Sequence, residues 1–351
     1  MGFSVRNAAR TKLVTLINRV LLLLERLLQQ LSEEDFLQAT ERDIYYSYRL
    51  FLHRRPDPEG YKNYLNQISG RKYPLESFTD SFLYSDELQE IQEKRNQPVL
   101  INLPDFQIFV RINDLYIGGV IAKYGVYEPN VTLIVKELIQ PGMTFLDIGA
   151  NIGYYSMLVA AKVTDKGRVL AFEPIAENRD LFAKSMEVNK FQNMELFPYA
   201  VSDSEHTVSL EMGGRTSNSR ITSAAEANKN NLQAQTVVLD TFLSELTALD
   251  MIKMDIEGAE FLALNGMSSL VSRYKPHIIT EFSPGLIPKT SHVQPIEYLQ
   301  KIVGFGYNLQ IIYPDGSRSE TMLPQQILKY FAESVHSDHI DLLAMHPSKA
   351  V

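Results

Sequence analysis

The sequence predicts an α/β protein: a doubly wound, mostly parallel sheet preceded by a small all-α module. From about residue 131 onward, apolar strand-like runs alternate with amphipathic segments, a pattern typical of a parallel sheet with helices on both faces. Before that point the chain shows helix signals instead. Asp57 and Pro58 can open a helix that Gly70 closes, and Pro74 can open another. The 351 residues are sufficient for two domains.

The composition excludes several classes of protein. A hydrophobic fraction of 45% and a charged fraction of 22% are those of a globular chain with a core. The net charge of −8 argues against a broadly basic surface, so we expect no nucleic-acid partner. Without cysteine there is no disulfide, thiolate metal site or cysteine nucleophile. No spacing of His, Asp and Glu is typical of a metal site, so no metal is expected; the alternative is a metal held partly by the substrate beside Asp255, Glu257 and Glu281.

The first 40 residues predict an amphipathic, leucine-rich helix. Its apolar seam consists of Leu13, Ile17, Val20, Leu24, Leu27 and Leu31. Arg19, Glu25 and Arg26 interrupt the run, which therefore predicts neither a membrane span nor a signal peptide. We expect a cytoplasmic protein whose helix packs on its own chain or on a second copy. The alternative is a basic helix lying on an anionic membrane surface.

Residues 41–98 form the predicted helical module. The segment from Tyr48 to Gly60, with Tyr64-Leu65 and the run from Phe82 to Leu88, is distantly similar to phycobilisome linker domains, with Tyr64 in the place of the usual tryptophan. Nothing in this module indicates chemistry. Residues 99–130 alternate as a β-hairpin that leads into the main domain, residues 131–351.

The predicted strands of the main domain are Thr144–Ile148, Val169–Phe172, Glu195–Val201, Met251–Met254 and His277–Phe282. Helices are expected near 152–163, 176–190 and 259–271, and the polar stretch 213–233 is expected to be a long loop. In such a sheet a ligand binds at the carboxyl ends of the strands.

The strongest motif runs from Phe145 to Tyr154, where a buried strand enters a glycine turn that opens a helix. Glycine permits the tight turn and the close approach of a ligand to the backbone. Glu173 ends the next strand, twenty residues after Gly153. A carboxylate there can accept hydrogen bonds from both hydroxyls of a ribose. These features indicate a nucleoside-binding site.

Two details favour S-adenosylmethionine over a dinucleotide. Asn151 holds the middle position of the pyrophosphate fingerprint, where a glycine is usual. Asp147 precedes the turn, where it would repel a diphosphate but would suit the ammonium and sulfonium of S-adenosylmethionine. The weaker alternative is that Asp147 only caps the turn.

A third block, Lys253 to Glu260, places acids where the reactive methyl is expected. Asp255 ends the fourth strand, and Glu281 ends the fifth. With Glu257 they can form a carboxylate cluster from which we expect one catalytic residue. Lys253, in an apolar strand, needs a carboxylate partner if it is buried.

These three blocks together resemble the FkbM family of methyltransferases, and the resemblance covers roughly residues 120–347. It implies a class I, Rossmann-like methyltransferase domain with S-adenosylmethionine as cofactor. The family's pattern places Glu128, Asp147, Gly149, Asn151 and Glu173 at the cofactor. The same pattern places the segment from Tyr199 to Asp203, with Ala200, at the border of the adenine. We assign Gly153, Pro174, Ala200 and Asp255 to the same site.

The resemblance implies O-methylation of a sugar, a glycan or a related small metabolite. Methyl transfer to a hydroxyl is an in-line displacement in which a positioned base removes the proton, and a buried carboxylate can be that base. Two alternatives remain: a scaffold protein with a degenerate methyltransferase fold, and another nucleotide-dependent α/β enzyme. The intact Asp147, Gly149, Gly153 and Glu173 argue against the scaffold.

Overall fold

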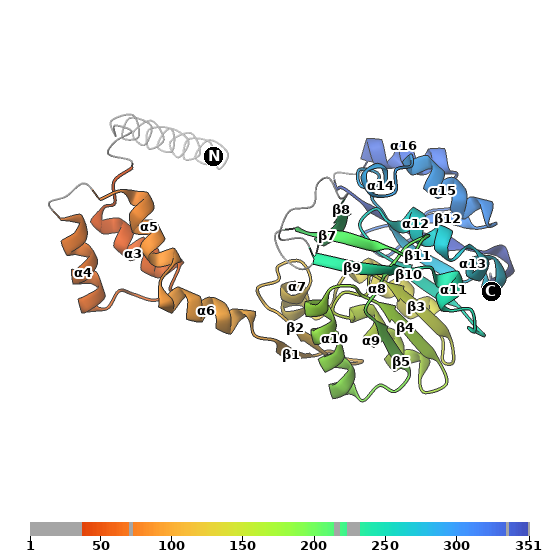
Figure 1. Ribbon diagram of the computed structural model, residues 1–351, viewed down its shortest axis with the longest axis horizontal. Coiled ribbons are helices and arrows are strands. Elements are labelled where there is room, and N and C mark those ends of the chain that lie inside the picture. Colours follow the sequence, from red (N-terminus) through yellow and green to blue (C-terminus); the bar gives the residue numbers. More distant parts are fainter. Residues whose placement is uncertain (1–36, 70–72, 214–217, 223–231, 335–336, 350–351) are drawn as a thin grey trace, which may run out of the picture. The chain divides into compact units, whose positions relative to one another are not determined.

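The computed structural model describes residues 37–69, 73–213, 218–222, 232–334 and 337–349 (Figure 1). The chain divides into two compact units, Met1–Asn96 and Gln97–Val351. Most of the expected leucine-rich helix, residues 1–36, lies outside the described residues. Within the described ranges, no helix has the length and apolar character needed to cross a membrane.

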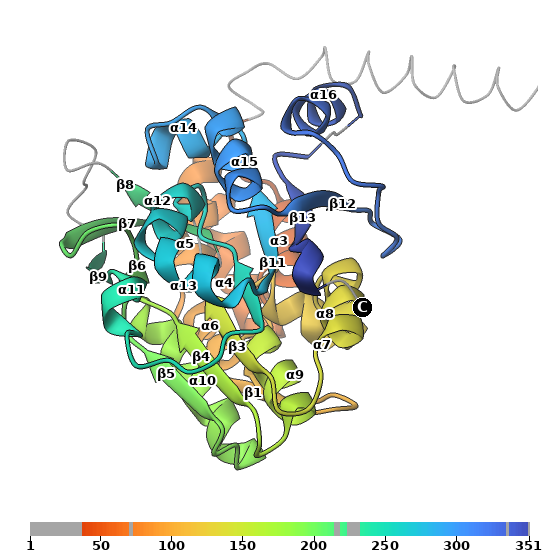
Figure 2. The ribbon, with the colours of Figure 1, turned by 90° about the vertical axis from the view of Figure 1, so that its right-hand side faces the viewer.

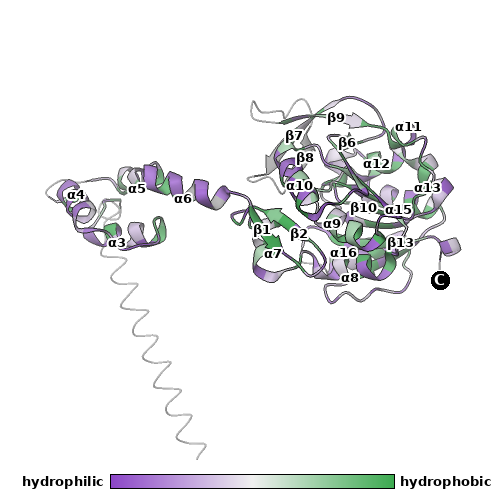
Figure 3. Ribbon diagram, turned by 90° about the horizontal axis from the view of Figure 1, so that it is seen from below, coloured by the Kyte–Doolittle hydropathy of each residue, from purple (hydrophilic) through white to green (hydrophobic). Residues whose placement is uncertain are grey.

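The described part of the first unit is helical. Its helices are α3 (Glu41–Leu50), α4 (Pro58–Ile68), α5 (Leu75–Leu83) and α6 (Asp86–Asn96). The Asp57 carboxylate accepts the Gly60 N–H at the start of α4, so the predicted cap is present. Aromatic and aliphatic side chains form the core, where Tyr64 stacks on Phe82 with 4.6 Å between ring centroids. Figure 3 shows α6 mostly in purple, in keeping with its polar sequence.

The second unit begins with a hairpin and two helices. Strand β1 (Val99–Asn102) pairs antiparallel with β2 (Gln107–Val110), and α7 (Gly118–Tyr124) and α8 (Pro129–Leu138) follow. Buried side chains of β2, α7 and α8 belong to the core that covers one face of the main sheet.

The predicted doubly wound sheet is confirmed. Its seven strands lie in the order β12-β13-β11-β10-β3-β4-β5. The parallel strands are β3 (Thr144–Ile148), β4 (Arg168–Phe172), β5 (Met194–Phe197), β10 (Met251–Met254) and β11 (His277–Phe282). The edge strand β12 (Asn308–Ile312) and β11 both pair antiparallel with β13 (Ile340–Met345). All side chains of β3 are buried, as expected for a strand covered on both faces.

Helices cover both faces of this sheet (Figure 2). Because side chains alternate along a strand, Leu146 faces one core and Phe145 the other. Helices α9 (Tyr154–Val163) and α10 (Ala176–Asn189) pack with Phe145. The opposite face carries α11 (Leu239–Phe242), α12 (Glu260–Gly266), α13 (Ser268–Tyr274), α14 (Ile287–Thr290), α15 (Pro295–Gly304) and α16 (Pro324–Ser334). The predicted helix 259–271 is thus two helices, separated at Met267.

A second, small sheet corrects two expectations. The predicted strand Glu195–Val201 is divided, because β5 belongs to the main sheet and β6 (Ala200–Val201) to a sheet of order β6-β9-β7-β8. The other strands are β7 (Thr207–Gly213), β8 (Asn218–Thr222) and β9 (Leu232–Val237). The expectation of one continuous loop over 213–233 was therefore wrong, since β8 lies within it and pairs with β7. Strand pairing depends on backbone hydrogen bonds, so a polar sequence does not exclude it.

Candidate active site

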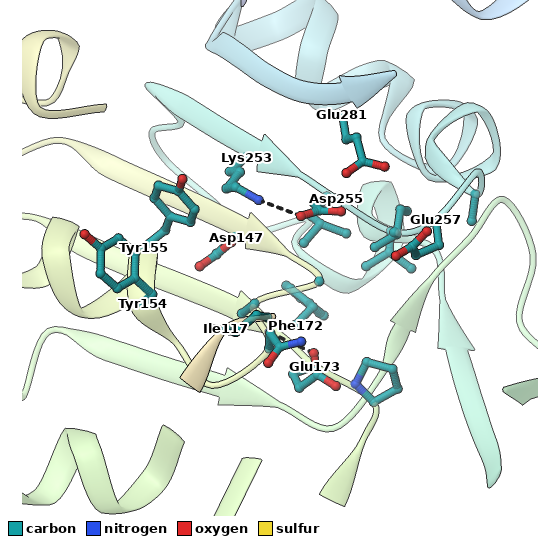
Figure 4. Close-up of a pocket in the computed structure, with 18 of the residues that line it drawn as sticks. Ile117, Asp147, Tyr154, Tyr155, Phe172, Glu173, Lys253, Asp255, Glu257 and Glu281 are labelled. Atoms are coloured by element: carbon teal, nitrogen blue, oxygen red, sulfur yellow. Dashed lines mark hydrogen bonds and ion pairs between the residues drawn. The ribbon is translucent and has the colours of Figure 1, made fainter. Parts of the chain in front are cut away.

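A cavity of about 350 Å³ lies at the carboxyl ends of β3, β4, β10 and β11 (Figure 4). Its volume is within the range of small-molecule sites. Most of the residues predicted for the site line this cavity: Glu128, Asp147, Gly149, Asn151, Glu173, Pro174, Ala200, Asp255, Glu257 and Glu281. Segments distant in sequence are therefore brought together at the edge where the sheet topology predicts a ligand.

Gly153 is not among the lining residues. It has φ +87° at the start of α9, and a Cβ there would lie 2.5 Å from the Phe182 ring. Gly153 therefore permits close packing of α9 on α10. Gly149 does line the cavity, but a Cβ at this residue would lie 2.1 Å from the Asp255 carbonyl oxygen. The close approach that it permits is thus to the loop after β10 rather than to a ligand.

The Glu173 carboxylate accepts hydrogen bonds from the backbone at and near the glycine turn. One carboxylate oxygen accepts the Asn151 N–H at 2.8 Å, and the other accepts the Ile175 N–H at 2.8 Å. Asn151 itself has φ +51°, in the left-handed region. Burial raises the pKa of Glu173 to about 7, although these hydrogen bonds lower it. A carboxylate oxygen can accept more than one hydrogen bond, so this carboxylate retains acceptor capacity for a ligand.

Asp147 is buried at the end of β3. Its carboxylate accepts the Ser156 hydroxyl at 2.6 Å, and burial raises its pKa to about 6 against the opposing effect of Lys253. Ser156 lies in the first turn of α9, so Asp147 links the end of β3 to the start of this helix.

Lys253 has the carboxylate partner that its burial requires. Its Nζ lies 3.1 Å from Asp255 Oδ2 and 4.7 Å from the centroid of the Tyr155 ring. Burial lowers the pKa of Lys253, but the carboxylates of Asp255, Glu128 and Asp147 outweigh it and the pKa lies above the usual value. The lysine is therefore charged and ties β10 to α9.

Glu281 lies across the cavity from Glu173 (Figure 4). Burial, followed by the neighbouring Asp255 carboxylate, raises its pKa to about 10, so the free protein holds this carboxyl protonated at neutral pH. The Ser283 hydroxyl donates to one of its oxygens at 2.5 Å, and His339 Nδ1 lies 4.0 Å from the other.

Glu257 is held in a strained backbone conformation, with φ +55°. The Glu260 carboxylate accepts the N–H groups of Ile256 and Gly258 on either side of it, and the Thr290 hydroxyl donates to its carbonyl oxygen. The surrounding contacts thus fix the position of Glu257 at the cavity.

Several lining residues were not predicted. Tyr127 adjoins Glu128 in the sequence, and its motif could have indicated it. Tyr155 follows directly after the predicted glycine motif. His339 lies just before β13, and no local sequence pattern indicated its approach to Glu281.

The cavity has a strongly acidic lining. The acids are Glu128, Asp147, Glu173, Asp255, Glu257, Glu281 and Asp338, whereas Lys253 is the one lysine or arginine among the described residues that line it. Such a lining suits a ligand that carries positive charge. In the ranges that the structure describes, no group of three His, Cys, Asp or Glu side chains is arranged to hold a metal ion.

Comparison with known proteins identifies the domain. The family model "Methyltransferase FkbM domain" matches residues 147–309, which include the glycine turn, Glu173 and the acidic block. No curated protein sequence matches the chain significantly.

Solved methyltransferase structures resemble this chain only distantly. A methyltransferase FkbM from Methylobacillus flagellatus KT is 16% identical with a TM-score of 0.37, and the match covers 60% of this chain and 50% of that chain. An S-adenosylmethionine-dependent O-methyltransferase from Thermotoga maritima is 13% identical with a TM-score of 0.34, over 74% of this chain and 81% of the other. The family match to residues 147–309 contains the blocks on which the sequence resemblance rests, and this part of the chain is similar to FkbM methyltransferase domains.

Proposed function

We propose that this methyltransferase uses S-adenosylmethionine to methylate a hydroxyl group of a sugar, a glycan or a related small metabolite. The observation that carries the cofactor assignment is the acidic cavity at the carboxyl edge of the sheet, with seven acidic side chains and one lysine in its lining. S-adenosylmethionine carries an ammonium and a sulfonium, which suit an acidic cavity. The match of residues 147–309 to a methyltransferase domain supports the same cofactor.

The donor and acceptor groups of the cavity fit this cofactor. Glu173 has acceptor capacity for ribose hydroxyls, and Tyr199 and Ala200 supply an adjoining wall for the adenine. Asp147 and Asp255 place negative charge between the nucleoside end and the opposite edge of the cavity. Bound S-adenosylmethionine supplies a methyl group activated by the positive sulfur, and the protein must align the acceptor oxygen with it.

Removal of the acceptor's proton falls to one of the three acids Asp255, Glu257 and Glu281. Asp255 forms an ion pair with Lys253. Glu281 carries its own proton at neutral pH in the free protein, so it becomes a base only when a neighbouring positive charge lowers its pKa. A cationic cofactor beside it has this effect.

Calorimetric titration of the full chain with S-adenosylmethionine and S-adenosylhomocysteine tests the cofactor, with NAD as the competing ligand. We expect micromolar binding of the first two compounds and none of NAD. Glu173→Gln should weaken binding at least tenfold, whereas Glu187→Gln, at an exposed acid of α10, should not. Failure of a folded sample to bind either compound would reject the proposal and favour a scaffold role.

Transfer is then measured with hydroxyl-bearing acceptors, from simple glycosides to polysaccharide fragments, by formation of S-adenosylhomocysteine. Acceptor-dependent turnover that is lost in Glu281→Gln, with cofactor affinity retained, would support a hydroxyl acceptor and a catalytic carboxyl group. Turnover only with amine acceptors would reject O-methylation.

A further inference from the structure

A group of side chains near Asp147 remains unexplained by the nucleoside contacts. In Figure 4, Tyr155 and Glu173 lie on opposite sides of Asp147. Around Tyr155 the cavity is lined by Tyr127, Glu128 and Lys253. Glu128 lies in the turn before α8, Tyr155 in helix α9 and Lys253 in strand β10.

Glu128 occupies a position that a structural role does not require. It is the residue before α8, but its side chain makes no capping hydrogen bond to that helix. Instead the Tyr155 hydroxyl donates to its carboxylate at 2.7 Å. Its backbone has φ +39°, a left-handed conformation that is unfavourable for a residue with a side chain. Such strain is common where a binding group must be held in place.

Lys253 lies next to this carboxylate and keeps hydrogen-bonding capacity. An ammonium group has three N–H donors, and among the described residues its one hydrogen bond goes to Asp255 at 3.1 Å. The Tyr155 ring lies beneath the ammonium at 4.7 Å from its centroid. One tyrosine therefore contacts both charged groups: its hydroxyl holds Glu128 and its ring faces Lys253.

We propose that Glu128 and Lys253 bind the α-amino-acid end of S-adenosylmethionine, with Tyr155 as the positioning residue for both. This inference rests on the proposed cofactor. An α-amino acid is a zwitterion, so its recognition requires a carboxylate for the ammonium and a cation for the carboxylate. Lys253 is the one lysine or arginine among the described lining residues, and Glu128 faces the same tyrosine. Glu173, the expected ribose ligand, is on the other side of Asp147, which leaves this side for the amino-acid end.

Two ligands that share the nucleoside and the thioether test the proposal by calorimetry on the full chain. S-adenosylhomocysteine has the amino-acid end, and 5′-methylthioadenosine lacks it. We expect Tyr155→Phe to weaken binding of S-adenosylhomocysteine about tenfold, as for the loss of a hydrogen bond to a charged group, and to change binding of 5′-methylthioadenosine less than about twofold. Glu128→Gln should show the same selectivity with a larger loss. Tyr307→Phe is the matched control, because Tyr307 is equally buried and lies outside the cavity lining.

The outcomes separate this proposal from the proposed function. If the unaltered protein binds neither ligand, the cofactor assignment is wrong and this inference with it. If it binds both, but Tyr155→Phe weakens them equally or weakens neither, the cofactor assignment stands and the positioning role of Tyr155 is rejected. Thermal unfolding of each variant shows whether an equal loss arises from a damaged fold.

Discussion

Replacement of Glu281 by glutamine should stabilise the protein at neutral pH. The carboxyl group is mostly buried, with 13% of its side chain exposed, and its pKa is raised from 4.5 to about 10 by burial and by Asp255. At pH 7 the folded protein therefore retains a proton that the unfolded chain releases. Glutamine is uncharged in both states and close to the protonated acid in shape, and it can still accept the Ser283 hydroxyl.

The size of the effect follows from proton linkage. A raised pKa in the folded state means that the stability contributed by the protonated group is complete below pH 4.5 and is lost as the pH rises. Each pH unit between 4.5 and 7 lowers the free energy of unfolding by about 1.4 kcal/mol. The loss at pH 7 is thus about 3 kcal/mol, and it depends only on the folded pKa being above 7. Glu281→Gln removes it.

Urea unfolding of the full chain at pH 7 and at pH 4.5 measures this difference, with Glu187→Gln as the control for an exposed acid. We expect the free energy of unfolding of Glu281→Gln to exceed that of the unaltered protein by up to about 3 kcal/mol at pH 7 and by little at pH 4.5. The reasoning would be refuted by a destabilised variant at pH 7, or by an equal gain at both pH values. Either result would show that Glu281 is ionised in the folded protein.

Three further predictions follow from the same site. Lys253→Met should lower the free energy of unfolding by about 3–5 kcal/mol, because it leaves Asp255 without its partner. Urea unfolding measures this loss. Adding Asp255→Asn to the variant should restore part of the lost stability. Gly149→Ala should lower the free energy of unfolding by about 2–4 kcal/mol, because the residue has φ +80° and the new Cβ would lie 2.1 Å from a backbone oxygen. Gly285→Ala is the control: a Cβ there would meet no atom within 4 Å, so the loss in the same thermal or urea assay should be far smaller. Binding of S-adenosylhomocysteine should strengthen about tenfold from pH 6 to pH 8, because the pKa of Glu173 is about 7 and only its carboxylate accepts both ribose hydroxyls; a calorimetric pH series on Glu173→Gln should lose this dependence.

The sequence was sufficient for the fold class and for much of the cavity lining. Phe145, Leu146 and Ile148 are apolar positions interrupted only by Asp147, and Thr144–Ile148 forms the fully buried β3. Glu173 follows the neighbouring parallel strand, so its place beside the glycine turn is implied once both strands are recognised. Local patterns of this kind carry the information because strand period, turn glycines and helix starts depend on residues close together in the chain.

The remaining features depend on the tertiary structure. The approach of the Tyr155 ring to Lys253, and the hydrogen bond from the Tyr155 hydroxyl to Glu128, join side chains from distant segments. No periodicity encodes such contacts, because they depend on the direction of each side chain in the packed domain. The same reason explains Gly149, whose missing Cβ makes room for the carbonyl oxygen of Asp255. The sequence by itself determined a doubly wound sheet of the methyltransferase type, with acidic residues at the carboxyl ends of its strands. Which acids are protonated, paired or available to a ligand was decided only by burial and by neighbours that the fold brings together.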